Sequence, residues 1–134
     1  MAKRVRIGLA GLELHKEDLW TASDPYFTIS TNTVSEMEFD EVIAYKSEHV
    51  DNDPSPLWME VSLPLAQLCD GDLNRRLRIQ VCDHNYTKLY ELIGSFNASL
   101  EELKRGFERR EPFPLKNSKY PGKEMGRIVV KHFE

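Results

Sequence analysis

The chain contains several short segments in which apolar and polar residues alternate. In the first of them Val5, Ile7 and Leu9 alternate with charged or small residues. Successive side chains of a β-strand point to opposite faces, so this alternation places three apolar side chains on one face of a half-buried strand. Similar alternation occurs in residues 26–31, 59–63, 77–81 and 127–133. Residues 41–47 and 112–116 are weaker candidates, the second because two prolines remove ladder donors and suit only an edge strand.

Turn and helix signals separate these segments. Pro64 is placed to open a short helical turn. Ser99 and Glu102 have the spacing of a capping box, in which the serine hydroxyl and the glutamate carboxylate satisfy free amides at a helix start. The sequence therefore predicts one short helix near residues 99–105, with Gly106 as its end. Several strands separated by turns, rather than alternating strands and helices, favour an all-β antiparallel sandwich.

Length, composition and charge limit the classes of protein. The 134 residues, 40% of them hydrophobic, predict one domain with one core over residues 1–134. The net charge is −4 with both signs mixed along the chain, so we expect no nucleic-acid partner. No apolar run is long enough to span a bilayer, and charged residues interrupt the N-terminus before a signal peptide can form. Cys69 and Cys82 have no metal-ligand spacing and form no disulfide framework, which fits a soluble, cytoplasmic protein.

Catalytic chemistry is not indicated by the sequence. The four histidines are scattered, and no serine or cysteine is placed beside a visible base. The chain also has no glycine-rich phosphate loop. We therefore expect a binding protein rather than an enzyme.

Acidic and amide side chains gather beside two of the expected strands. Asp83, Asn85 and Glu91 lie on one short stretch, and Asp18 and Asp24 lie far upstream. Loops at strand ends can bring such residues together from distant parts of a chain. Hard oxygen donors in a many-ligand arrangement suit Ca²⁺ better than zinc or copper. The alternative is that these residues are solvated loop tips and turn caps, although converging carboxylates repel one another.

Three motifs in order resemble the C2 domain. They are the tetrapeptide from Ser23 to Tyr26 after an aspartate six positions earlier, a Pro-x-Trp element at 56–58, and Val81-Cys82-Asp83 leading to Leu92-Ile93-Gly94. Within that family, residues 16–20 and 62–72 are similar to the second C2 domain of copines. The resemblance implies an eight-stranded antiparallel Greek-key β-sandwich whose loops at one end bind Ca²⁺ and then an anionic phospholipid membrane. Because copines are longer, with two such domains and a von Willebrand A-like domain, we expect an excised fragment or a stand-alone relative.

The family pattern, carried over position by position, gives five calcium ligands. Asp18 and Asp24 fall in the first loop, and Asp83, Asn85 and Glu91 in the third. The usual residue at both Asn85 and Glu91 is aspartate, so one ligand loses its charge and another changes its reach. We therefore expect a weaker site, or one occupied by a single ion.

Apolar and amphipathic residues flank these ligands in the same two loops. Tryptophan and tyrosine suit a bilayer interface, and a lysine is placed to reach a lipid phosphate or the ligand oxygens themselves. The predicted membrane-binding residues are Leu19, Trp20, Tyr86, Lys88, Leu89 and Tyr90. The sequence thus predicts a calcium-regulated phospholipid-binding module that becomes peripheral to the membrane on calcium binding. The alternative is a calcium-independent protein-interaction module with a degenerate calcium site and a protein partner.

Overall fold

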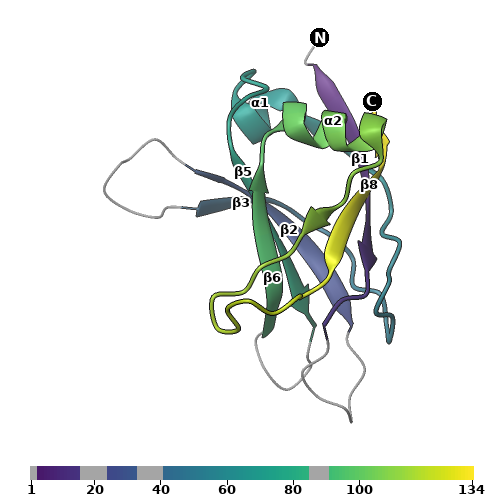
Figure 1. Cartoon of the computed structure of the whole chain (residues 1–134). Coiled ribbons are helices and arrows are strands. Elements are labelled where there is room, and N and C mark those ends of the chain that lie inside the picture. Colours follow the sequence, from purple (N-terminus) through teal and green to yellow (C-terminus); the bar gives the residue numbers. More distant parts are fainter. Residues whose placement is uncertain (1–2, 16–23, 33–40, 85–90) are drawn as a thin grey trace.

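The computed structural model describes residues 3–15, 24–32, 41–84 and 91–134, which form two packed four-stranded antiparallel sheets (Figure 1). One sheet has the strand order β4-β1-β8-β7, and the other has the order β3-β2-β5-β6. The strands are β1 (Arg4–Leu12), β2 (Pro25–Asn32), β3 (Glu41–Lys46), β4 (Val61–Pro64), β5 (Leu77–Asp83), β6 (Glu91–Ala98), β7 (Phe113–Pro114) and β8 (Arg127–Phe133). The predicted eight-stranded antiparallel sandwich is confirmed.

Both weak strand candidates are present, and one stronger candidate starts later than predicted. β3 and β7 are edge strands of their sheets, and an edge position suits the proline of β7, Pro114. The prediction of a strand over 59–63 was wrong at its start, since β4 begins at Val61. The backbone N–H of Met59 donates to Oε2 of Glu48 at 2.8 Å rather than to a neighbouring strand.

Two helices lie together at one end of the sandwich (Figure 1). α1 (Leu65–Cys69) follows Pro64, and α2 (Leu100–Arg109) begins at the predicted capping box. Ser99 Oγ accepts a hydrogen bond from the Glu102 backbone N–H, and Glu102 Oε1 accepts one from the Ser99 N–H, both at 3.1 Å. Within the described residues, neither helix has the length and apolar composition that a membrane-spanning helix requires.

α2 continues past the glycine that was predicted to end it. The predicted start of this helix is confirmed, but its predicted end at Gly106 was wrong, because the helix runs to Arg109 and Arg110 caps it with a φ of 56°. Gly106 is buried instead against Phe113, and a Cβ built on it would lie 2.6 Å from Cε2 of that ring. The glycine therefore allows the helix to pack close to β7.

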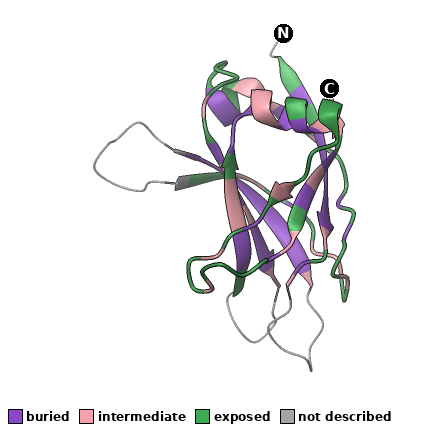
Figure 2. Cartoon of the chain, viewed as in Figure 1, coloured by how far each residue is buried: buried purple, intermediate pink, exposed green. Residues whose placement is uncertain are grey.

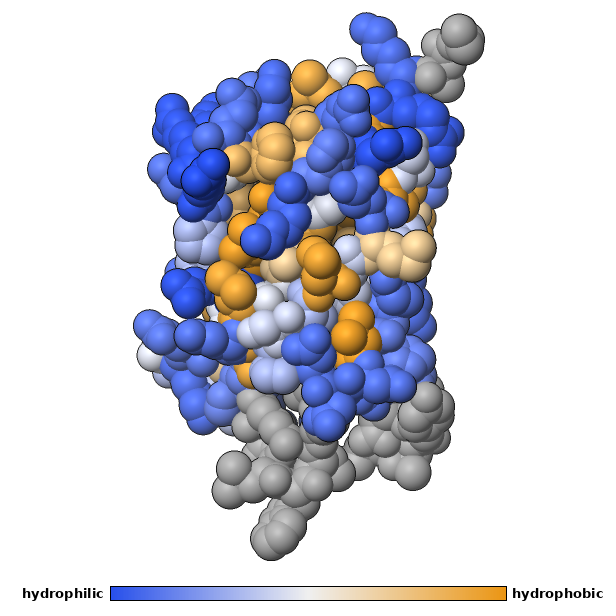
Figure 3. All heavy atoms as spheres, turned by 90° about the vertical axis from the view of Figure 1, so that its right-hand side faces the viewer, coloured by the Kyte–Doolittle hydropathy of each residue, from blue (hydrophilic) through white to orange (hydrophobic). Residues whose placement is uncertain are grey.

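The inner faces of the two sheets form one continuous core. Much of the strand ribbon is coloured as buried in Figure 2, and the outside view in Figure 3 shows hydrophobic residues scattered among hydrophilic ones. Trp58 is 2% exposed and meets the ring of Phe27 edge-on, with 5.0 Å between the ring centroids. Phe96 and Phe133 are partly buried and pack against this core. This core holds the two sheets in a fixed position relative to each other. The packing of the sandwich therefore determines where the residues at the strand ends lie.

One end of the sandwich collects strand termini that are distant in sequence. β1 and β5 end there, and β2 and β6 begin there, opposite to α1 and α2 (Figure 1). The predicted ligand residues of the described chain belong to these termini. The fold therefore brings the two acidic segments to the same end.

Gly106→Ala tests the close packing between α2 and β7. Alanine normally stabilises a helix interior by about 1 kcal/mol relative to glycine. Here we expect net destabilisation of about 1 to 3 kcal/mol, because the added methyl group displaces the Phe113 ring, which is stacked on Phe96. Urea unfolding measures the change, with Lys104→Ala on the exposed surface of the same helix as the control. Equal or greater stability of Gly106→Ala would contradict this packing.

Candidate metal centre

Three of the predicted oxygen ligands lie in the described chain, and the fold brings them to one place. Asp24 directly precedes β2, Asp83 ends β5, and Glu91 begins β6. The antiparallel register pairs Pro25 with Asp83, and Asp83 with Glu91. Three acidic residues from distant sequence positions thus lie at the same end of one sheet.

The other predicted site residues fall outside the described residues, and their roles stay predictions. They are the ligands Asp18 and Asn85 and the membrane-binding residues Leu19, Trp20, Tyr86, Lys88, Leu89 and Tyr90. Each lies in segment 16–23 or 85–90. The described strand ends that flank these two segments, in β1, β2, β5 and β6, lie at the same end of the sandwich (Figure 1). The neighbouring strand ends therefore fix the points from which both segments start.

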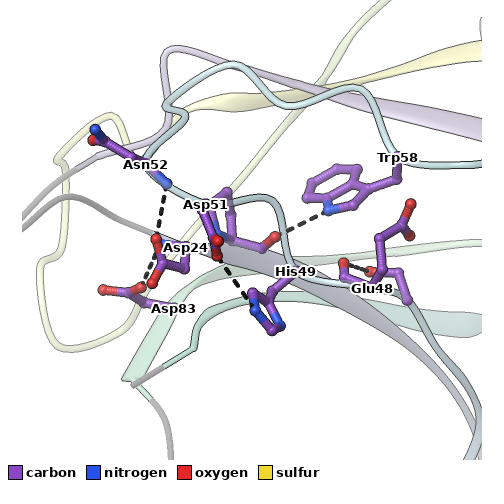
Figure 4. A network of polar contacts seen from close by, with 9 residues as sticks. Asp24, Glu48, His49, Asp51, Asn52, Trp58 and Asp83 are labelled. Atoms are coloured by element: carbon purple, nitrogen blue, oxygen red, sulfur yellow. Dashed lines mark hydrogen bonds and ion pairs between the residues drawn. The ribbon is translucent and has the colours of Figure 1, made fainter. Parts of the chain in front are cut away.

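Hydrogen bonds join the acidic residues to one another through the backbone (Figure 4). The N–H of Asp24 donates to Oδ1 of Asp83 at 2.8 Å, and the N–H of His84 donates to the carbonyl of Asp24 at 2.9 Å. Oδ1 of Asp24 accepts from the N–H of Asn52 at 2.8 Å. The position of each carboxylate is therefore set by a second chain segment.

The turn at 49–52 is a part of this centre that sequence reasoning did not include. Asn52 has a φ of 54°, which asparagine tolerates, and its N–H points at Asp24. Asp51 lies beside it with Oδ1 3.3 Å from Nε2 of His49 (Figure 4). The local signal was an Asp-Asn turn before the Pro-x-Trp element, but its contact with Asp24 depends on tertiary packing.

Aromatic rings support the backbone beneath the carboxylates. Trp58 Nε1 donates to the carbonyl of Pro25 at 3.0 Å, so the core tryptophan holds the start of β2 (Figure 4). The rings of His49 and His84 stack with centroids 4.2 Å apart and 6° between their planes. This stack joins the 49–52 turn to the end of β5, so three segments are fixed at this end.

The electrostatics of the centre disfavour the charged form of Asp83. Burial raises its pKa, and repulsion from Asp24 and Glu91 adds to the increase. The hydrogen bond from the Asp24 N–H and the nearby His84 act in the opposite direction. The net direction is upward, so the arrangement favours any positive charge placed among these oxygens.

The donors that are present suit a hard cation, but they do not complete a site. In the described segments, neither Asp24 nor Asp83 forms an ion pair with arginine or lysine, and each has only one carboxylate oxygen in a hydrogen bond. No group of three or more His, Cys, Asp or Glu in those segments is arranged to hold a metal ion. Ca²⁺ needs roughly six to eight oxygens, so Asp24 and Asp83 fit as part of a larger ligand set.

A small cavity adjoins the same carboxylates. It has a volume of about 20 Å³ and is lined by His15, Asp83, Glu91, Tyr120 and other residues. This volume is enough for about one water molecule. The acidic end of the sandwich therefore contains space for a small species beside Asp83.

Comparison with known sequences identifies relatives of this chain. The model of the C2 domain matches residues 5–115. The chain is 34% identical over 116 residues to Copine-B of Dictyostelium discoideum and 33% identical over 116 residues to Copine-F of the same organism. These matches cover 87% of this chain but only 21% and 20% of the two copines. The chain thus spans about one fifth of the length of these curated relatives.

Solved structures show the same fold. The structure named BON1-C2B superposes with a TM-score of 0.84 at 23% identity, covering 98% of this chain and 90% of that one. The C2A domain of a plant Extended Synaptotagmin 1 gives a TM-score of 0.64 at 18% identity, covering 96% and 91%. The C2 family model matches most of the chain, and the observed β-sandwich is the fold of these C2 structures. The chain belongs to the C2 domain family, with copines among its relatives, and such domains are typically non-catalytic membrane, lipid or protein-interaction modules.

Proposed function

We propose that residues 1–134 act as one non-catalytic domain that binds anionic phospholipid membranes under the control of calcium. The observation that carries the proposal is the convergence of Asp24, Asp83 and Glu91 at one end of the sandwich. Asp83 is held there although burial and its acidic neighbours raise its pKa. Such an arrangement costs stability unless a cation compensates the charge.

The proposed ligand set adds residues from the two adjoining segments. It consists of Asp18, Asp24, Asp83, Asn85 and Glu91. Asn85 contributes a neutral oxygen, so the total ligand charge is lower than in a set made only of aspartates. Because ligand charge tunes calcium affinity, we expect one ion bound with a Kd in roughly the micromolar to millimolar range.

Membrane contact follows from the charge of the same end. Without calcium, the carboxylates repel an anionic lipid surface. A bound Ca²⁺ supplies positive charge and free coordination positions that lipid phosphate oxygens can fill. Under this proposal Leu19, Trp20, Tyr86, Leu89 and Tyr90 then enter the headgroup region, and Lys88 contacts phosphate. The protein would become peripheral to the membrane when calcium rises.

The second candidate is a calcium-independent protein-interaction module. It is favoured by Asn85 and Lys88 in the third loop and by the incomplete ligand group among the described residues. In this case the chain has the C2 fold but no functional calcium site. Calcium dependence of the native state separates the two candidates.

Calcium is expected to stabilise the native protein against heat. An ion bound only by the folded state contributes about 2.7 kcal/mol when its concentration is 100 times Kd. Asp83→Asn should abolish most of the calcium-induced rise in Tm, because it removes a charged ligand but keeps an oxygen that can accept from Asp24. Differential scanning fluorimetry in chelator and in increasing calcium measures both proteins.

Without calcium, Asp83→Asn is not expected to lower the stability of the protein. The pKa of Asp83 is raised in the folded state, so its ionisation lowers the free energy of unfolding as pH rises through that folded-state pKa. The stability is therefore already reduced at neutral pH. In chelator, Asp83→Asn should therefore melt at the same or a higher temperature than wild type. Asp70→Asn, beyond α1 at the opposite end, is the matched control and should keep the full calcium response. A wild-type Tm unchanged by millimolar calcium would favour the second candidate.

Membrane binding is expected to need the aromatic residue of the first loop. Trp20→Ala should reduce sedimentation with phosphatidylserine vesicles in calcium by roughly tenfold in affinity, since an interfacial aromatic contributes on the order of 1 to 2 kcal/mol. Its calcium-induced rise in Tm should persist. Met59→Ala, which removes an apolar side chain that is 72% exposed elsewhere on the surface, should sediment like wild type. Equal sedimentation of Trp20→Ala and wild type would exclude insertion of this loop.

A further inference from the structure

The described surface contains a groove of about 990 Å³ along the edge of the sandwich. One side is formed by β5 and β6, including Arg78 and Ser95, and the other by the segment between β7 and β8, including Lys116, Tyr120 and Lys123. We refer to it as the lateral groove. Its volume lies at the upper end of the range of roughly 300 to 1,000 Å³ found for small-molecule sites, so it is large enough for a short peptide segment.

Hydrogen bonds hold the outer wall of the lateral groove against β6. Ser95 and Lys116 exchange two backbone hydrogen bonds, of 2.9 and 3.0 Å. Asn117 Nδ2 donates to the carbonyl of Leu92 at 3.0 Å, and its Oδ1 accepts from the Lys119 N–H at 3.0 Å. The groove is therefore already formed in the free protein, which lowers the entropy cost of binding a ligand.

The lateral groove is basic although the protein is acidic. The charged lining residues are four basic ones, Arg78, Lys116, Lys123 and Arg127, and two acidic ones, Glu13 and Glu124. Arg127 is paired with Glu13 at 3.5 Å, whereas Lys116 and Lys123 form no ion pair within the described residues. The whole chain has a net charge of −4, so this groove is a local positive region.

Apolar surface lies among these cations. Tyr120 lines the groove, and the ammonium groups of Lys119 and Lys123 each lie 5.6 Å from its ring centroid. Leu92, also in the lining, is 37% exposed despite its position in β6. A ligand that fits both features carries negative charges and apolar side chains together.

We propose that the lateral groove binds an acidic linear peptide of a partner protein, independently of calcium. The basic side chains are spread over β5, the segment between β7 and β8, and the start of β8, which matches carboxylates spaced along an extended chain. A compact polyphosphate headgroup would instead need several cations gathered at one point. The inference goes beyond the proposed function because it uses none of the acidic residues at the calcium end.

A fluorescein-labelled short peptide that alternates glutamate with leucine and phenylalanine tests this proposal. Fluorescence anisotropy in chelator should show saturable binding to the wild-type domain, weakened by added salt. The double variant Lys116→Glu, Lys123→Glu should raise Kd by at least about tenfold, as expected for the loss of charge-assisted hydrogen bonds. Binding should shift the backbone amide NMR signals of residues 92–95 and 116–123.

A control double variant has the same change in net charge as Lys116→Glu, Lys123→Glu, but at two positions outside the groove. Lys104→Glu, Lys131→Glu alters two exposed lysines that do not line the groove and should bind the peptide like wild type. The same peptide with glutamine in place of glutamate should not bind. Equal loss in both double variants, equal binding of the glutamine peptide, or no binding of the acidic peptide would overturn the proposal. Binding of phosphoinositide vesicles in chelator that needs Lys116 and Lys123, without peptide binding, would assign the groove to membranes instead.

Discussion

The hydrogen bond from the Asp24 N–H to the Asp83 carboxylate is the contact on which the arrangement of this end depends. It joins the first residue before β2 to the last residue of β5, 59 positions apart, at a distance of 2.8 Å. Two antiparallel strands held by the core bring the residues this close. The bond fixes the direction of one carboxylate while the second carboxylate receives the N–H of Asn52. The core and the backbone hydrogen bonds therefore hold acidic residues close together, although burial and charge repulsion disfavour their ionised forms.

The strand pattern could be predicted because it is local. Alternation over Val5, Ile7 and Leu9 is enough to define a buried face, and the Ser99 and Glu102 capping box defines a helix start. The end of α2 could not be predicted in the same way. Gly106 has the sequence signal of a helix end, but in the structure it is required because the ring of Phe113, from the later strand β7, packs directly against it. Packing between elements overrides such a local signal.

The candidate site was predictable in part for the same reason. Asp24, Asp83 and Glu91 stand at strand ends, so their convergence follows once the sheet order is known. The contact of Asn52 with Asp24 and the stack of His49 on His84 involve a turn in the connection between β3 and β4, and no spacing in the sequence indicates either contact. The basic lateral groove is likewise formed by residues from three separate stretches. Tertiary structure alone shows that Arg78, Lys116 and Lys123 share one surface.

The proposed function requires that oxygens from two remote segments bind a single cation at the end of the sandwich. A crystal structure of the domain grown in millimolar calcium tests it most directly. We expect an ion about 2.3 to 2.6 Å from oxygens of both Asp24 and Asp83, with further oxygens from the neighbouring segments completing its shell. Well-defined electron density with no ion between these two carboxylates would contradict it.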